Sequence, residues 1–204
     1  MNIVTIVTAR YDSQRLPGKA LLPLNNKPML WHVVDRARKA ELINDVMVAT
    51  SIDSKPIIDF CLNYGIPYFA GAENDILSRL YCAAGQAKAD IVVRLWGDCP
   101  FILPHVIDKV IQCYLENHPD YAYNVGFPSG EDVAVIGFTK LEELCLNLKE
   151  AKDREWIHKH VIEHPDLYDI KIVEQKPSLT HLKWSVDTLE DYERMKVIFQ
   201  CCQE

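Results

Sequence analysis

Short apolar runs alternate with helical patterns along the chain. The first run, Ile3–Thr8, is β-branched and typical of a buried strand. Pro28 then opens a stretch whose apolar residues recur at helical spacing. Further strands are predicted at 46–50, 67–70, 91–96, 121–125, 132–137, 170–174 and 182–186. Further helices are predicted to begin at Asp53 or Ser54, at Asn74 or Asp75 and after Pro104, and to cover 141–149, 155–163 and 189–201.

This alternation predicts the class of the fold. Units of strand and helix in sequence favour a mixed, mostly parallel sheet with helices on both faces, and ligands then bind beyond the carboxyl ends of its strands. The middle, residues 121–137, is expected to depart from strict alternation because two strands flank a Pro-Ser-Gly turn. The 204 residues show no linker or repeat, so we expect a single α/β domain over 1–204.

Composition and charge exclude several classes of function. The net charge is −7, but residues 1–40 hold seven basic and two acidic side chains. That distribution predicts a local anion site and argues against nucleic-acid binding. The absence of a long apolar run or a basic leader predicts a cytoplasmic protein without a membrane span. Seven cysteines without Cys-x-x-Cys spacing favour reduced thiols over disulfides or zinc.

The loop after the first strand concentrates positive charge. It runs from Ala9 to Lys19 and includes Arg10, Arg15 and a Pro-Gly turn at Gly18. Arginine binds phosphate oxygens through a bidentate fork and lysine adds a point charge, so the loop suits a polyphosphate. Neither the P-loop pattern nor Gly-x-Gly-x-x-Gly is present. On charge alone, a solvated surface loop is an equal alternative.

Two aspartates follow predicted strands on the same expected edge. Asp98 comes after residues 91–96, and Asp187 comes after 182–186. Carboxylates there suit Mg²⁺, which commonly takes one or two of them together with substrate phosphates. The structural alternatives are a turn cap for Asp98 and a helix N-cap for Asp187.

Five segments together resemble one enzyme family. They are ARYDSQRLPGK (9–19), NDILSRLYCAA (74–84), ADIVVRLWGDCPFI (89–102), PSGEDVAVIGFTKLEEL (128–144) and SVDTLEDYE (185–193). In order and spacing they are similar to the cytidylyltransferases that activate acidic sugars, CMP-Kdo synthetase and CMP-acylneuraminate synthetase. The likeness is greatest to relatives from spore-coat polysaccharide biosynthesis. It implies a Rossmann-like, GT-A-like nucleotidyltransferase domain that transfers CMP from CTP to a sugar, with a homodimer as an assembly to test.

The resemblance also implies roles for individual residues. Nucleotide-binding positions fall on Ala9, Arg10, Ser13, Arg15, Pro17, Gly18, Lys19, Ser78, Arg79, Gly97 and Asp98. Catalytic positions fall on Arg10, Arg15, Lys19 and Asp98. The resemblance places Mg²⁺ on Asp98 and Asp187, and the acceptor sugar near Asn124, Glu131 and Asp132. Two alternatives stay open: a sugar-phosphate nucleotidylyltransferase, and a nucleotide-binding member of the family without activity.

Three residues depart from the family pattern. Asp12 replaces a small residue beside the expected triphosphate, and Trp96 replaces a small polar one before Gly-Asp. Trp156 replaces a histidine, and we expect it to be a packing residue. His158 shows no ligand spacing and is expected to have no metal role.

Overall fold

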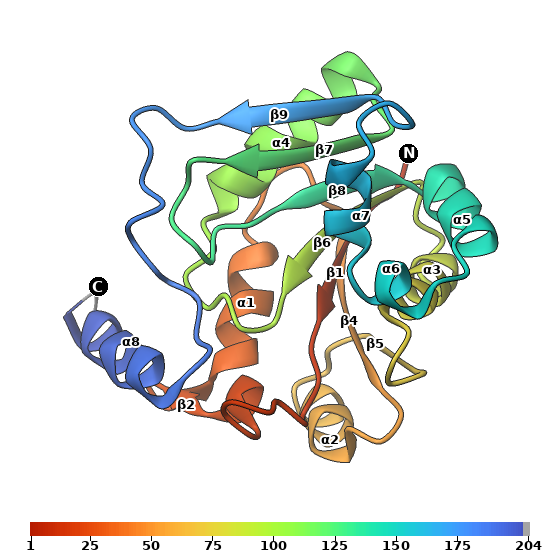
Figure 1. Ribbon diagram of the computed structural model, residues 1–204. Helices are drawn as coiled ribbons and strands as arrows, with labels where there is room; N and C mark the ends of the chain where they lie inside the picture. The colour runs from red at the N-terminus through yellow and green to blue at the C-terminus, as the bar shows by residue number, and fades with distance from the viewer. Residues whose placement is uncertain (202–204) are drawn as a thin grey trace.

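The computed structural model describes residues 1–201. Within that range seven strands form the central sheet, in the order β5-β4-β1-β6-β8-β7-β9 (Figure 1). Its strands are β1 (Ile3–Thr8), β4 (Asp45–Ser51), β5 (Tyr68–Gly71), β6 (Ile91–Trp96), β7 (Tyr121–Val125), β8 (Ala134–Gly137) and β9 (Ile170–Glu174). All are parallel except β8, which runs antiparallel to both β6 and β7. The predicted mixed sheet with an irregular middle is confirmed.

Helices cover both faces of this sheet, as predicted. They are α1 (Met29–Ala37), α2 (Lys55–Asn63), α3 (Ile76–Gln86), α4 (Pro104–Asn117), α5 (Phe138–Asn147), α6 (Ala151–Glu155), α7 (Ile157–Glu163) and α8 (Leu189–Cys201). Helices α1, α2 and α4 pack on one face, whereas α3, α5 and α7 pack on the other. Because side chains alternate along a strand, each central strand contributes to both cores.

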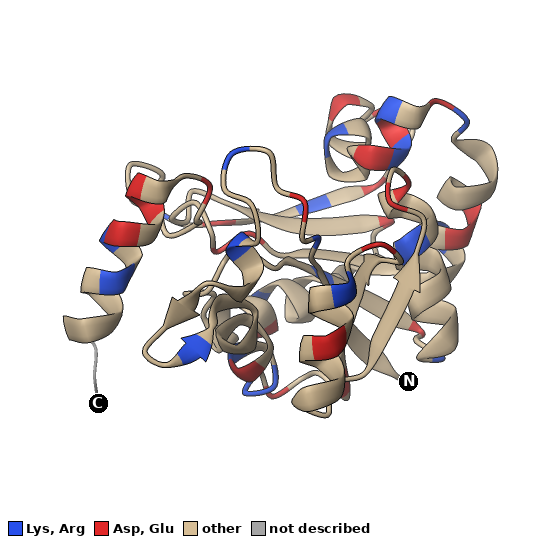
Figure 2. Cartoon of the chain, turned by 90° about the horizontal axis from the view of Figure 1, so that it is seen from below, with Lys and Arg blue, Asp and Glu red and all other residues tan. Residues whose placement is uncertain are grey.

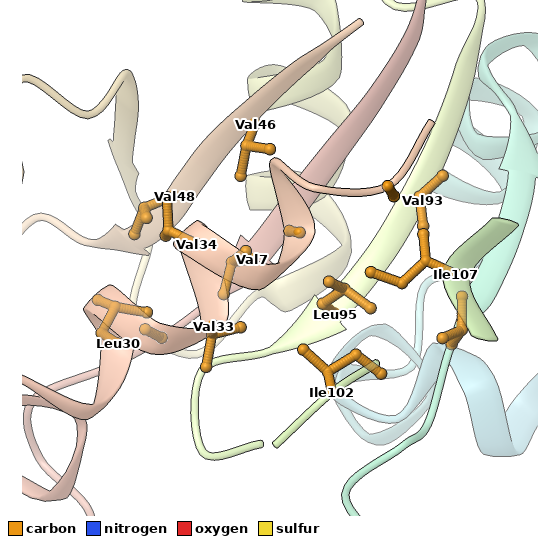
Figure 3. Packing of buried hydrophobic residues seen from close by; sticks show 14 of the residues in the cluster. Val7, Leu30, Val33, Val34, Val46, Val48, Val93, Leu95, Ile102 and Ile107 are labelled. Carbon is orange, nitrogen blue, oxygen red and sulfur yellow. The ribbon is translucent and has the colours of Figure 1, made fainter. Parts of the chain in front are cut away.

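The first core illustrates that alternation. Val7 of β1 and Leu95 of β6 meet Leu30 and Val33 of α1 beneath the sheet (Figure 3). The intervening residues of the same strands face the second core. Arg94 and Trp96 belong to that second set, so β6 carries a charged side chain toward α3 and α7.

The C-terminal helix packs against the beginning of the chain. A short 3-10 helix (Lys19–Leu21) leads into the hairpin of β2 (Pro23–Leu24) and β3 (Lys27–Pro28). Met195 and Phe199 of α8 form a small core with Leu24 and Met29. This contact brings the segment before α8 next to the loop that follows β1.

Two predicted elements differ from the structure. Residues 182–186 are not a strand. The amides of Trp184 and Ser185 both donate to the carbonyl of Ser129, and the amide of Val186 donates to the backbone carbonyl of Asp98. The helix predicted over 155–163 begins at Ile157 as α7, and a separate helix, α6, ends at Glu155, because Trp156 between them adopts a non-helical φ of −110° and ψ of 44°. Within residues 1–201, no helix is long and apolar enough to cross a membrane.

Candidate active site

A cleft of about 800 Å³ lies at the carboxyl ends of β1 and β6. The loop after β1, the start of α3, the end of β6, the α6–α7 junction and Asp187 line it. Figure 2 looks onto this edge of the sheet and shows both positive and negative segments there. The cleft therefore lies where the parallel-sheet rule places a ligand.

Lys19 joins the two predicted metal-binding carboxylates. Its ammonium donates to Asp98 Oδ2 at 2.6 Å, to Asp187 Oδ1 at 3.1 Å and to the carbonyl of Val186 at 2.9 Å. Arg15 donates to the same Asp187 oxygen at 2.7 Å. We call Arg15, Lys19, Asp98 and Asp187 the carboxylate end of the cleft. The predicted convergence of the first loop with the two aspartates is thus present in the structure.

Two glycines shape the backbone at this end. Gly18 has a φ of +68°, and its amide bonds back to the carbonyl of Tyr11 at 2.9 Å, which folds the loop over itself. At Gly97 a Cβ would come within 2.8 Å of the Cβ of Ala9. Any larger residue at Gly97 would therefore push the first loop away from the end of β6.

Asp191 holds Asp187 in place. Its Oδ2 accepts hydrogen bonds from the amides of Asp187 and Thr188 at 3.0 and 3.1 Å, which caps the start of α8. Although burial opposes ionisation, hydrogen bonds from Lys183 and Arg194 keep the pKa of Asp191 well below its usual range. At Asp187, burial likewise opposes ionisation, and the hydrogen bond from Lys19 outweighs it and lowers the pKa. Both carboxylates are therefore anionic at neutral pH.

The chemistry of this end fits a divalent cation together with phosphate. Asp98 and Asp187 share one ammonium, so oxygens of both can reach a single cation in its place. Within residues 1–201, no group of three acidic, histidine or cysteine side chains could hold a metal without help. The remaining ligands would be phosphate oxygens and water, the usual mixture around Mg²⁺.

The other end of the cleft is aromatic. Arg94 lies over the ring of Trp96, with its guanidinium carbon 4.6 Å from the ring centroid. His158 of α7 contacts the same indole edge-on at 6.0 Å between centroids. Trp156 also lines the cleft. We call Arg94, Trp96, Trp156 and His158 the aromatic end.

Electrostatics at the aromatic end differ from those at the carboxylate end. Burial, reinforced by the charge of Arg94, lowers the pKa of His158 to about 4, so the imidazole is neutral at pH 7. The neutral ring shares a hydrogen bond of 3.0 Å between Nδ1 and the hydroxyl of Tyr121. Arg94 is therefore the charged group of this end.

Most sequence-predicted nucleotide positions line the cleft. They are Ala9, Arg10, Ser13, Arg15, Lys19, Arg79, Gly97 and Asp98, together with Asp187. Pro17, Gly18 and Ser78 lie outside the lining. Gly18 shapes the loop, and Ser78 donates its amide to the capping carboxylate of Asp75 at 2.9 Å. Asp12 is exposed and outside the lining, so it adds no negative wall to the cleft.

The three predicted acceptor residues do not line this cleft, although burial, together with the charge of nearby Asp98, raises the pKa of Asp132. Asn124 donates to the carbonyl of Glu131 and accepts from the amide of Val133, both at 2.8 Å. It thereby clamps the connection between β7 and β8. Burial, followed by the charge of Asp132, raises the pKa of Glu131 to about 7. None of Asn124, Glu131 and Asp132 lines the cleft.

Sequence reasoning missed most of the aromatic end. Trp156 is not a packing residue, because 59% of it is exposed beside the cleft. His158 and Arg94 also line the cleft. The available signal was Arg94 itself, a single charge inside the apolar strand Ile91–Trp96.

The comparisons agree with this geometry. The profile of a family described as Cytidylyltransferase matches residues 4–204. The chain belongs to the cytidylyltransferase family. Like its relatives, this cytidylyltransferase is a nucleotidyltransferase, and its relatives include CMP-sugar synthetases.

Three similar proteins show which members of the family this cytidylyltransferase resembles. It is 29% identical to the spore coat polysaccharide biosynthesis protein SpsF of Bacillus subtilis, covering 98% of this chain and 87% of SpsF. It is 37% identical to the 8-amino-3,8-dideoxy-manno-octulosonate cytidylyltransferase of Shewanella piezotolerans over 72% of this chain and 57% of that one. The solved cytidylyltransferase of Leptospira borgpetersenii superimposes with a TM-score of 0.94 at 26% identity, covering 100% of this chain and 89% of that one.

Proposed function

We propose that this cytidylyltransferase transfers CMP from CTP to a hydroxyl of a sugar and uses Mg²⁺ for the reaction. The observation that carries the proposal is the contact of Lys19 with both Asp98 and Asp187. One ammonium and two carboxylates then share the site where a triphosphate would meet the loop of residues 9–19. The activities named for SpsF and for the Shewanella enzyme, spore coat polysaccharide biosynthesis and octulosonate cytidylyl transfer, support a sugar acceptor for polysaccharide synthesis.

Each residue of the carboxylate end has a defined task in this scheme. Arg15 is 65% exposed at its side chain, so it can leave Asp187 for an incoming phosphate at little cost. Lys19 can transfer its donors from the two carboxylates to phosphate oxygens. Asp98 and Asp187, released from Lys19, are the residues that would hold Mg²⁺. When bound, the metal neutralises charge on the phosphates and lowers the pKa of the attacking hydroxyl.

Positioning and charge neutralisation carry the catalysis in this scheme. In phosphoryl transfer the nucleophile must lie in line with the leaving group, and the protein supplies fixed cations around the phosphates. Arg10, Arg15 and Lys19 supply those cations from the loop after β1, and Asp98, just after β6, would hold the metal beside them. Pyrophosphate then leaves toward the basic loop.

Pyrophosphate release tests the proposal. The protein would be incubated with CTP, MgCl₂ and a panel of free sugars, sugar acids and sugar phosphates. We expect release with at least one free sugar and its loss in D98N. Release only with sugar phosphates would favour the sugar-phosphate nucleotidylyltransferase. CTP binding by calorimetry without release from any sugar would favour a non-catalytic nucleotide-binding protein.

A further inference from the structure

Arg94 is a buried cation without a partner among the described residues. Only 6% of it is exposed, and its Nε has no hydrogen-bond partner. Within residues 1–201 its guanidinium forms no hydrogen bond and no ion pair, and its charge lies over the ring of Trp96. A charge removed from water without compensation is costly, so such a group demands an explanation.

Arg79 shows that the same face of the sheet can satisfy a buried guanidinium. It is 2% exposed, and although its Nε has no partner either, its Nη1 donates to the carbonyls of Ala72 and Glu73 at 2.6 and 2.5 Å. The carboxylates of Asp75, Glu73 and Glu155 also act on its charge. Arg79 is therefore held by the protein itself, and the contrast isolates Arg94 as the exception.

The groups around Arg94 are neutral or positive. On its own strand it meets the face of Trp96, and from α7 it meets the neutral His158. Burial raises the pKa of Tyr121 on β7, so that phenol does not supply a negative charge. Arg79 on α3 repels it, and burial together with this repulsion lowers the pKa of Arg94.

The position of Arg94 separates it from the triphosphate residues. Asp98 lies in the turn after β6, whereas Arg94 lies inside that strand, two residues before it ends at Trp96. Its guanidinium lines the cleft between α3 and α7, whereas Lys19 and Arg15 lie at the carboxylate end. A group bound at Arg94 is thus the far end of a ligand whose reacting part lies at Asp98.

We propose that Arg94 binds an oxyanion, a carboxylate or a phosphate, of a substrate in the aromatic end of the cleft. The guanidinium fork matches two oxygens of such a group, and the indole of Trp96 fixes the plane of the fork. The separation from Lys19 favours the acceptor as the source of the oxyanion over the nucleotide. The assignment to the acceptor rests on the proposed function, whereas oxyanion binding itself does not.

The first test uses stability, which needs no turnover. In R94M a side chain of similar length removes the uncompensated charge, so we expect the melting temperature of the free protein to rise by about 2–4 °C. Acetate or phosphate, replacing chloride at equal ionic strength, should stabilise the wild type and leave R94M unchanged. R38M, at an exposed position outside the cleft, should behave as the wild type in both respects.

R94K provides a second variant that keeps the charge. It lacks the fork, so its affinity for acetate should be roughly tenfold weaker than that of the wild type. A melting temperature of R94M below that of the wild type would overturn the proposal, because it would assign Arg94 a structural role against Trp96. Equal stabilisation of the wild type and R94M by both anions would also overturn it.

The second test identifies the source of the oxyanion. Calorimetry with CTP and MgCl₂ on R94M should give a dissociation constant within twofold of the wild type if the acceptor supplies the oxyanion. A dissociation constant weakened tenfold or more would support oxyanion binding and assign it to a nucleotide phosphate. Neither test needs CMP transfer. If the protein failed to transfer CMP, the melting temperatures and the CTP affinities would still test oxyanion binding by Arg94.

Discussion

Lys19 and Arg94 line the same cleft, and their surroundings are opposite. At the carboxylate end, Lys19 uses all three donors on Asp98, Asp187 and the carbonyl of Val186. At the aromatic end, Arg94 lies beside the face of Trp96, a neutral imidazole and the neutral phenol of Tyr121, and no carboxylate of residues 1–201 pairs with it. One end is electrically balanced without a ligand, and the other carries a charge in excess.

This difference indicates how the two ends use a ligand. Balanced charges must exchange partners when a triphosphate arrives, so binding there is a competition between Lys19 and the incoming groups. An uncompensated charge gains a partner without giving one up, so binding there relieves a cost already present in the free protein. Sites where a sequence breaks a packing rule are frequently functional, and Arg94 breaks one inside an apolar strand.

The largest effect should come from breaking the carboxylate end at Asp98. D98N keeps the shape and an acceptor for Lys19 but removes the charge that would hold the metal. We expect turnover to fall at least about 100-fold, the size of effect seen when one preorganised electrostatic group is removed. Pyrophosphate release measures it, with D35N on the surface of α1 as the control. Turnover within threefold of the wild type would remove Asp98 from the mechanism.

Removing Lys19 should separate its contribution to CTP binding from its competition with Mg²⁺ for the two carboxylates. K19M deletes a charged hydrogen-bond donor, so CTP affinity should fall about 10- to 100-fold. Because the ammonium no longer competes for Asp98 and Asp187, the free protein should bind Mg²⁺ more tightly than the wild type. Calorimetric titrations with CTP and with MgCl₂ alone measure both effects. K39M, which breaks only the exposed pair with Asp35, is the matched control. Unchanged affinity for both ligands would contradict the competition.

The aromatic end should make the protein sensitive to acid through His158. The pKa of His158 in the folded protein is about 4, below the unfolded value of 6.5, so the unfolded state binds the extra proton first. The stabilisation is complete above pH 6.5 and is lost as the pH falls toward 4.

We expect His158 to account for about 2 kcal/mol of stability lost between pH 7 and pH 4.5, allowing for its partial exposure. Urea unfolding at the two pH values measures the loss, and H158F should lack this part of it. The other histidines are common to both proteins and cancel in the comparison. An identical pH dependence of H158F and the wild type would show that His158 titrates normally.

The smallest effect on stability should come from Trp156. Since 59% of this residue is exposed, W156A should change the free energy of unfolding by no more than about 0.5 kcal/mol. W184A, which removes a side chain packed against the core of α8, should lower it by at least about 1 kcal/mol. Denaturant unfolding of both variants makes the comparison. A large destabilisation by W156A would restore the packing role that its sequence context suggests.

The sequence predicts the elements whose signals are local. Short apolar runs and helical patterns locate β6, β7, β9 and α8 at their observed bounds, and Asp75 caps α3 as one of the two expected residues. Residues 182–186 have a strand-like pattern, but their amides bond to Ser129 and Asp98, which are distant in sequence. The strand-end argument holds for the loop after β1 and for Asp98 after β6. Asp187 reaches the same edge without a preceding strand, because the amide of Val186 bonds to the carbonyl of Asp98. The aromatic end depends on the break at Trp156, which has no local signal.

Calorimetric titration of the wild type with CTP tests the central claim, that the basic loop and the two aspartates form a nucleotide and metal site. We expect one CTP per chain, with an affinity at least tenfold higher in MgCl₂ than in EDTA. In the double variant D98N/D187N this gain from Mg²⁺ should be absent. CTP binding that is unaffected by Mg²⁺, or a gain that persists in the double variant, would contradict the account.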